Sequence, residues 1–304
     1  WNPIGSDDIY AADKTFSGTF DGNGHSITGM RIDTNGSRPQ GSKMINAGLF
    51  SNVSGEVKNL NLIDSTVSAY SSNGTCVGIL AARNSGKISN CTVSGNSTAE
   101  SPYGGYSYAG GMIGINTGII QNCGSSVNVN VKGMTYSYAG GIAACSSTEN
   151  LVAIQNCFNK GKVYATATIT GAPQGIVTES ASAGGIVGQS SKGVISQCYN
   201  NGNIESIVST SNSQYANFRA YAGGIAGESG NCSPEYQSII ESYNSGNVYA
   251  QAQRPYAGGI AGTCCEAKNC YNIGTTSASN GSTTDVGFGI ALSSHSSFEN
   301  CYYL

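Results

Sequence analysis

The phrase AGGIAG at 222–227 returns unchanged at 257–262, and variants of it occur throughout the chain. The other copies are AGLFSN (47–52), VGILAA (77–82), AGGMIG (109–114), AGGIAA (139–144), AGGIVG (183–188) and FGIALS (288–293). Internal self-similarity at a period of this size indicates one supersecondary unit that was copied about eight times. A function is then expected along a repeated surface, and not in one pocket.

A second phrase follows each copy, as in IQNC (120–123) and ISQC (195–198), and a third often follows, as in GKVYA (161–165). Short apolar segments bounded by Gly, Asn and Ser are typical of strands. Three strands per unit predict one coil of a solenoid, whose core forms only when coils stack about 4.8 Å apart. We therefore expect an all-β fold, a parallel β-helix of about eight coils with three short strands per coil. It should be right-handed because parallel crossovers prefer that hand.

The second glycine of each phrase, or its equivalent in the weaker copies, is predicted to serve the fold. These positions need either a positive φ or a close approach of backbone, both of which glycine permits. A phosphate-binding loop would require a following helix, which the sequence does not suggest. The predicted members of this position are Gly48, Gly78, Gly111, Gly141, Gly185, Gly224, Gly259 and Gly289.

Six cysteines share one repeat position, where the first unit has Leu60 and another unit has Ser242. Leucine at an equivalent position predicts a buried apolar site. Equivalent side chains in stacked coils lie about 4.8 Å apart, whereas disulfides need Cβ atoms about 3.8 Å apart. The sequence therefore predicts a column of reduced core thiols, and it predicts no cofactor and no metal site. Whether the neighbouring Cys264 and Cys265 are redox-active stays open. The column is Cys91, Cys123, Cys157, Cys198, Cys270 and Cys301.

An asparagine precedes most of these cysteines, and it predicts a second column. Asparagine tolerates the left-handed conformation and can hydrogen-bond between stacked copies. The members are Asn59, Asn90, Asn122, Asn156, Asn269 and Asn300. Near the N-terminus, Asp21, Asn23 and His25 could suggest an ion or a catalytic group, but Asp-Gly-Asn-Gly is more typical of a tight turn.

The composition limits the classes of partner that we expect for the chain. The 14 Lys and Arg residues are dispersed, so nucleic acid is not expected. No apolar run approaches 18 residues, so no membrane insertion is expected. The chain begins at Trp1 without a leader, and we expect it to be a piece of a longer protein with flanking domains. We divide it into a lead-in strand, cap and first coil at 1–34 and one continuous repeat domain at 35–304.

Tyrosines gather before several of the glycine phrases, and tyrosine offers a flat ring with a polar tip to a ligand. The residues set further out or in the long insertions are the predicted ligand-binding set: Tyr103, Tyr106, Tyr136, Tyr215 and Phe218. The tyrosines closest to the glycines are expected to form an aromatic stack that packs the turn instead: Tyr108, Tyr138, Tyr221 and Tyr256.

The sequence gives little support to catalysis. Glycoside hydrolysis needs two carboxylates about 5 to 9.5 Å apart, and the close acidic pair is Asp7–Asp8 in the predicted cap. Other acidic residues occupy unmatched repeat positions: Glu205, Glu228, Glu235 and Glu241. We therefore expect no enzyme.

The glycine phrase followed by INC and a GNV-like segment resembles the GLUG-motif repeats of bacterial cell-surface proteins. The opening WNPIG and FSGTFDGNGHSI is similar to the lead-in of those repeat regions. Such repeats occur in secreted adhesin-like proteins and beside IgA-specific peptidases of Gram-positive bacteria. The resemblance implies an extracellular, accessory or adhesive role and carries over no catalytic residue, since the peptidases' HExxH motif is absent.

The expected function is therefore adhesion at the bacterial cell surface, by binding a glycan or a host or bacterial surface protein. One alternative is a pure spacer that holds another domain off the cell wall. A further alternative is a polysaccharide-acting enzyme, because parallel β-helices also host pectin-acting hydrolases and lyases.

Overall fold

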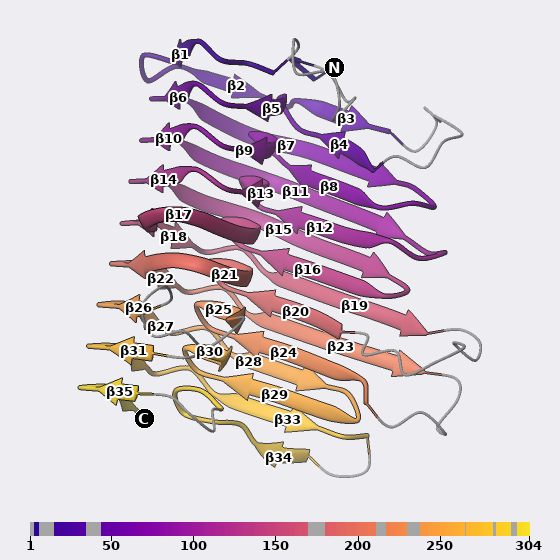
Figure 1. Cartoon of the computed structure of the whole chain (residues 1–304), viewed down its shortest axis with the longest axis vertical. Coiled ribbons are helices and arrows are strands. Elements are labelled where there is room, and N and C mark those ends of the chain that lie inside the picture. Colours follow the sequence, from indigo (N-terminus) through magenta and orange to yellow (C-terminus); the bar gives the residue numbers. More distant parts are fainter. Residues whose placement is uncertain are drawn as a thin grey trace.

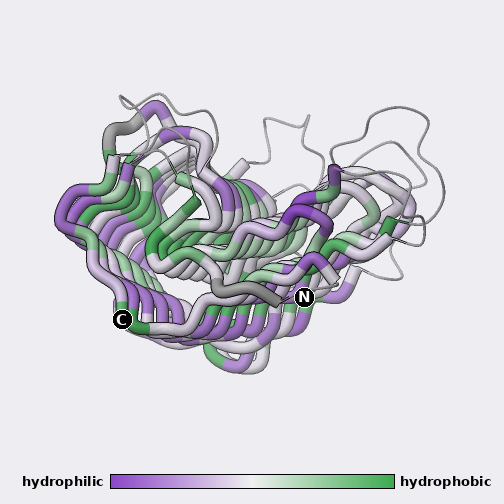
Figure 2. Tube along the Cα trace, turned by 90° about the horizontal axis from the view of Figure 1, so that it is seen from below, coloured by the Kyte–Doolittle hydropathy of each residue, from purple (hydrophilic) through white to green (hydrophobic). Residues whose placement is uncertain are grey.

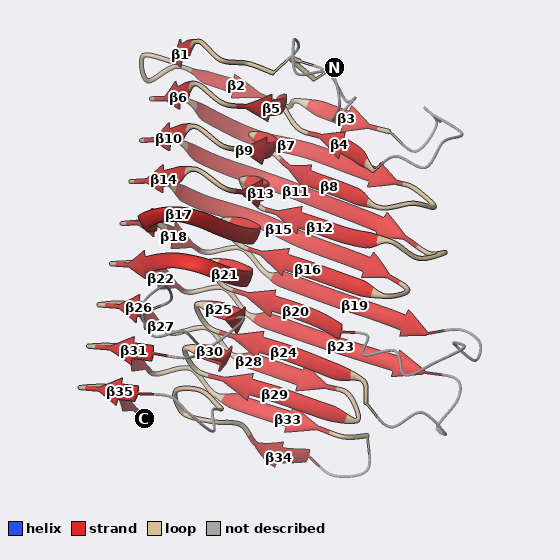
Figure 3. Ribbon diagram, in the orientation of Figure 1, coloured by secondary structure: helices blue, strands red, loops and turns tan. Residues whose placement is uncertain are grey.

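The structure is a computed structural model that describes residues 3–5, 15–34, 44–169, 180–210, 217–229, 238–264, 266–281, 284–292 and 297–304. Strands and their connections account for these residues, and no helix occurs among them (Figure 3). The strands stack one above another along the long axis of the molecule (Figure 1). Seen along that axis, the coils lie behind one another with nearly the same outline (Figure 2).

The described strands form three curled sheets, which we call A, B and C. Sheet C contains the strands that lead into the glycine phrases: β4 (Ile45–Ala47), β8 (Thr75–Gly78), β12 (Tyr106–Gly110), β16 (Tyr136–Gly140), β20 (Ser180–Gly184), β24 (Arg219–Gly223) and β29 (Arg254–Gly258).

Sheet A follows each glycine phrase. Its main row is β1 (Thr19–Asp21), β6 (Glu56–Lys58), β10 (Lys87–Ser89), β14 (Ile119–Gln121), β17 (Ala143–Gln155), β21 (Val187–Ser196), β26 (Ile239–Ile240), β31 (Glu266–Lys268) and β35 (Ser297–Glu299). Beside it lie β5 (Phe50–Val53), β9 (Ala81–Asn84), β13 (Ile113–Asn116), β25 (Ala226–Ser229) and β30 (Ala261–Thr263).

Sheet B closes each coil. Its strands are β2 (Ser26–Thr28), β3 (Arg31–Asp33), β7 (Asn61–Tyr70), β11 (Thr92–Ser101), β15 (Gly124–Gly133), β18 (Phe158–Asn159), β19 (Val163–Ile169), β22 (Tyr199–Asn200), β23 (Ile204–Thr210), β27 (Tyr243–Asn244), β28 (Val248–Gln251), β32 (Tyr271–Asn272), β33 (Thr276–Ser279), β34 (Thr284–Val286) and β36 (Tyr302–Tyr303).

Neighbouring strands pair in parallel, as the repeat predicts, and β33 with β34 is an antiparallel exception. At that place the last repeat folds back on itself instead of adding another strand to sheet C. The parallel all-β fold is confirmed, and the number of coils and their hand stay predictions. The core lies between the sheets, where side chains of equal position form columns, such as Val57, Ile88, Ile120, Ile154, Ile195 and Ile239.

The second glycine of the phrase is needed because of a close approach, and not because of a positive φ. These glycines are absent from the positive-φ residues of the described chain. A Cβ atom at Gly185 would overlap the carbonyl oxygen of Gly224 and the side chain of Asn200. Gly141, Gly224 and Gly259 face an asparagine in the same way. The prediction for Gly48 and Gly78 is wrong by one position and falls too early, because Gly78 pairs with Gly110, the first glycine of its phrase.

The asparagines that face these glycines form a buried column that the sequence analysis missed: Asn159, Asn200, Asn244 and Asn272. Nδ2 of each of the first three donates to Oδ1 of the asparagine in the next coil at 2.8 Å. Each also donates to the carbonyl oxygen two residues ahead, and each Oδ1 accepts the N–H of that same residue. Buried amides are tolerated in the core because every donor and acceptor has a partner. In an earlier coil, apolar Ile79 and Val93 hold the positions of this glycine and asparagine.

The cysteine column is confirmed as free thiols, all buried except the half-buried Cys301 at the C-terminal end. Cys91 donates from Sγ to the carbonyl oxygen of Ser89 at 3.3 Å, and Cys123 does the same with Gln121 at 3.1 Å. Burial is the first cause that raises the thiol pKa of Cys123 and Cys157. Cys264 is also buried, and Cys265 lies outside the described residues.

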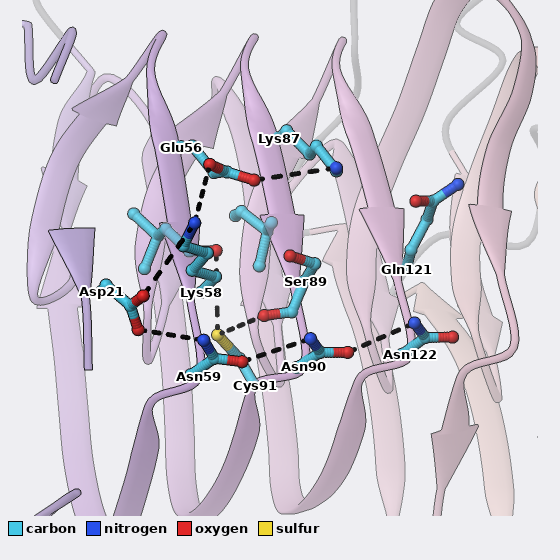
Figure 4. A network of polar contacts seen from close by, with 12 residues as sticks. Asp21, Glu56, Lys58, Asn59, Lys87, Ser89, Asn90, Cys91, Gln121 and Asn122 are labelled. Carbon is cyan, nitrogen blue, oxygen red and sulfur yellow. Dashed lines mark hydrogen bonds and ion pairs between the residues drawn. The ribbon is translucent and has the colours of Figure 1, made fainter. Parts of the chain in front are cut away.

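The exposed asparagine column is also confirmed, including its left-handed backbone, with φ near 54° at Asn59, Asn90 and Asn122. Nδ2 of Asn122 donates to Asn90, and Nδ2 of Asn90 donates to Asn59, both at 3.2 Å (Figure 4). Asn59 in turn donates to Oδ1 of Asp21 at 2.9 Å. An ionised carboxylate can only accept hydrogen bonds, so Asp21 is the N-terminal end of this chain of hydrogen bonds. The hydrogen bond from Asn59 is also the main reason that the pKa of Asp21 lies below its usual value.

Asp21 belongs to a turn, as its sequence predicts. Its Oδ1 accepts the N–H of Asn23 at 2.9 Å, and Asn23 and Gly24 have φ of 49° and 78°. In the described part of the chain, no group of three or more potential metal ligands comes together.

Candidate functional site

Two columns of side chains run along the outer face of sheet C. The strand register places Tyr106 beside Tyr136, followed by Ser180, Arg219 and Arg254. Two residues further along each strand, the second column contains Tyr108, Tyr138, Ser182, Tyr221 and Tyr256. Alternation along a strand puts both columns on the same face.

The four N-terminal tyrosines of these columns form a block of nearly parallel rings. Tyr106 stacks on Tyr136 with centroids 5.0 Å apart, and Tyr108 stacks on Tyr138 at 5.4 Å. The ring faces that meet within each pair are covered by the partner ring. The exposed fraction is 74% for Tyr103 and 45% for Tyr106, whereas it is 4% for Tyr138.

The tyrosines nearest the glycines do pack as an aromatic stack, but in two separate pairs. Tyr221 stacks on Tyr256 at 5.0 Å, and its exposed fraction is 5%. Ser182 lies between Tyr138 and Tyr221 in the register and interrupts the column. Its Oγ donates to the carbonyl oxygen of Gly188 at 2.7 Å.

One residue of the predicted ligand-binding set does not join this face. Phe218 has an exposed fraction of 1% and belongs to the core, so its selection as a surface residue was wrong. The reason is strand alternation: Arg219 and Tyr221 point outward, so Phe218 points inward. Tyr215 lies outside the described residues, as do 170–179 and 211–216 of the two long insertions. Tyr103, Tyr106 and Tyr136 remain as candidates.

A third column flanks the tyrosines across the glycine corner, seven residues after each member of the second column. In this column, Cys145 pairs with Gln189, and Gln189 pairs with Glu228. These three side chains are half-buried. Nε2 of Gln189 donates to Oε2 of Glu228 at 3.4 Å, and the Cys145 thiol lies 3.8 Å from Oε1 of Gln189.

Glu228 interacts with the tyrosines of sheet C as well as with the third column. Burial raises its pKa above the usual value, partly offset by the hydrogen bond from Gln189 and by the charge of Arg219. Burial also raises the pKa of Tyr221 to about 12, and the charge of Glu228 adds to that shift. The Tyr138 hydroxyl, two coils away, is affected by the same two causes. Arg219 donates from Nη1 to the Tyr221 hydroxyl at 3.3 Å.

We call these six residues the Glu228 cluster: Tyr138, Cys145, Gln189, Arg219, Tyr221 and Glu228. The prediction that Glu228 occupies an unmatched position is wrong, because Glu228 pairs with Gln189 and unequal coil lengths hide this alignment in the sequence. Among the other acidic residues, Glu241 accepts a hydrogen bond from Nε2 of Gln197 at 3.1 Å on the exposed surface. Glu205 pairs with Tyr164 and Tyr249 on sheet B. Asp7, Asp8 and Glu235 lie outside the described residues.

The column of Glu228 continues toward the N-terminus into a pocket of about 190 Å³. Asn52, Arg83 and Ile115 line this pocket, and the register joins them to Cys145 in one row. Arg83 donates from Nε to Oδ1 of Asn46 at 3.2 Å. Asn46 belongs to β4, so the row also contacts sheet C at this coil.

A second aromatic column, on the outer face of sheet B, was missed. Phe158, Tyr199, Tyr243 and Tyr271 stack with centroids 4.9 to 5.3 Å apart. The signal was present in the sequence as an aromatic residue directly after the cysteine position. Gly124 precedes them in the register, and its missing side chain leaves space for the Phe158 ring.

No helix in the described part of the chain is long and apolar enough to cross a membrane. No family model and no curated protein matches the chain. Among solved structures, it is similar to a "putative immunoglobulin A1 protease" from Bacteroides ovatus, with 18% identity and a TM-score of 0.49. That similarity covers 99% of this chain and 72% of the other.

Proposed function

We propose that the chain is a non-catalytic binding module of a bacterial cell-surface protein and acts in adhesion by holding a glycan. The observation that carries the proposal is the block of stacked tyrosines on sheet C, with Tyr106 and the loop residue Tyr103 strongly exposed. Stacking fixes the rings in advance, so little side-chain entropy is lost on binding.

The ring arrangement favours one kind of contact. Faces of Tyr106 and Tyr136 are turned toward each other, so their edges and hydroxyls meet the ligand. Hydroxyl groups repeating about every 5 Å along the rod match a polymer rich in hydroxyl groups, because each can donate and accept. A glycan fits this pattern better than an apolar ligand.

The GLUG-type resemblance supports an extracellular location, with flanking domains in a longer protein. We also infer a right-handed winding of about eight coils, from the preference of parallel crossovers. Such a rod would present the tyrosine block at a fixed distance from whatever anchors it.

The test is a glycan-array screen of the purified chain with host mucin sugars and bacterial wall polysaccharides. We expect binding that is lost when Tyr106 and Tyr136 are changed to Ala. Tyr199→Ala is the matched control, since Tyr199 stacks between two rings on sheet B. Circular dichroism confirms that each variant is folded. A blank array would refute glycan binding and favour the spacer or a protein partner.

A further inference from the structure

The Glu228 cluster combines groups from three consecutive coils and from both sides of the glycine corner. Tyr138 and Cys145 come from one coil, Gln189 from the next, and Arg219, Tyr221 and Glu228 from the third. In the middle coil Ser182 replaces a tyrosine. The register places Ser182 between Tyr138 and Tyr221, and it places Gln189 of this middle coil beside Glu228.

The cluster has hydrogen-bonding capacity that the described residues do not use. A carboxylate can accept about four hydrogen bonds, and the bond that these residues supply to Glu228 is the one from Gln189. Nε of Arg219 is buried and has no hydrogen-bond partner there. Unused buried donors and half-buried acceptors are unfavourable unless a ligand or water completes them.

The charges indicate which ligand would complete them. Glu228 and Arg219 together bring one negative and one positive group, so neither an anion nor a cation is favoured. Sugar hydroxyls suit this set, because each donates to a carboxylate or an amide oxygen and accepts from a guanidinium or an amide N–H. Bonds to charged groups are about twice as strong as neutral ones.

We propose that the Glu228 cluster is a binding site for a neutral oligosaccharide. Glu228 and Gln189 receive the hydroxyls of one sugar unit, and Arg219 donates to the same unit from the tyrosine side. The rest of the ligand follows the column past Cys145 toward the pocket at Arg83. That path spans four coil spacings, about 19 Å. This inference rests on the proposed glycan-binding function and names the ligand class and a second contact site.

Calorimetric titration of the full chain with neutral hexasaccharides of glucose, mannose and galactose tests the proposal, with a galacturonic acid hexasaccharide as the anionic comparison. We expect one neutral ligand to bind and Glu228→Gln to weaken it at least about tenfold, with a similar loss for Gln189→Ala. Glu241→Gln is the matched control, because Glu241 also accepts from a glutamine of the preceding coil but lies outside the cluster. It should bind like the unchanged protein.

The outcomes separate the two proposals. Equal affinity in Glu228→Gln and Glu241→Gln overturns the site, as does a preference for the anionic ligand. A glycan lost with Tyr106 and Tyr136 but retained in Glu228→Gln keeps the proposed function and overturns this inference. No binding to any hexasaccharide overturns it too, and the array then decides the function separately. Circular dichroism of each variant excludes unfolding as the cause of a loss.

Discussion

Changing Asn200 to Ala should destabilise the fold more than any surface asparagine does. The Asn200 side chain takes part in four hydrogen bonds: it donates to Gly202 and Asn244 and accepts from Gly202 and Asn159. Three of them are 2.8 Å or shorter. The residue is fully buried, so water does not replace the amide.

The expected loss follows from what the substitution leaves behind. Each hydrogen bond contributes about 1 kcal/mol net, and a buried group left without a partner adds about 1–3 kcal/mol. The N–H of Gly202 would lose its bond to Asn200 Oδ1. We therefore expect the free energy of unfolding to fall by about 5–7 kcal/mol. Neighbouring coils support one another, so the whole rod should become less stable.

Urea denaturation followed by far-ultraviolet circular dichroism measures this loss. Asn128→Ala is the control, because Asn128 is exposed and accepts one long hydrogen bond of 3.4 Å from Lys162. Its effect should stay within about 0.5 kcal/mol. If Asn200→Ala cost no more than this control, the buried asparagine column would not be holding the coils together.

Three further predictions concern the core and its titrating groups. Gly124→Ala should destabilise by about 1–3 kcal/mol because the new methyl group overlaps the Phe158 ring, and the added change Phe158→Ala should remove the clash in a urea double-mutant cycle. The pKa of Glu228 is raised on folding, so its stabilising contribution is complete below the unfolded value of about 4.3 and is lost as pH rises through the folded value. Glu228→Gln should therefore gain stability relative to the unchanged chain between pH 4 and pH 8, and a gain that shrinks with pH would contradict this. Brief alkylation at pH 8 should label the half-buried Cys145 at least about tenfold faster than Cys91, Cys123, Cys157 and Cys198, as read by peptide mass spectrometry, because the buried thiols react only when the coils open; equal labelling would show that the cysteine column is accessible.

Much of the fold could be predicted from the chain alone. The repeated phrases, the leucine at the cysteine position and the asparagine before it all express local requirements of one coil. Stacking identical coils repeats those requirements, so a one-dimensional pattern was enough to predict parallel strands, free buried thiols and a left-handed asparagine column.

The candidate site needed the tertiary structure, because it depends on the register between coils of unequal length. Only that register puts Gln189 beside Glu228 and leaves Ser182 between two tyrosine pairs. The contact between Gly185 and Asn200 also needed the tertiary structure, because these residues are distant along the coil and meet across its interior. Phe218 shows what the aromatic pattern could not predict. The pattern indicates an aromatic surface, but the alternation of side chains along the strand decides which aromatic residues point outward.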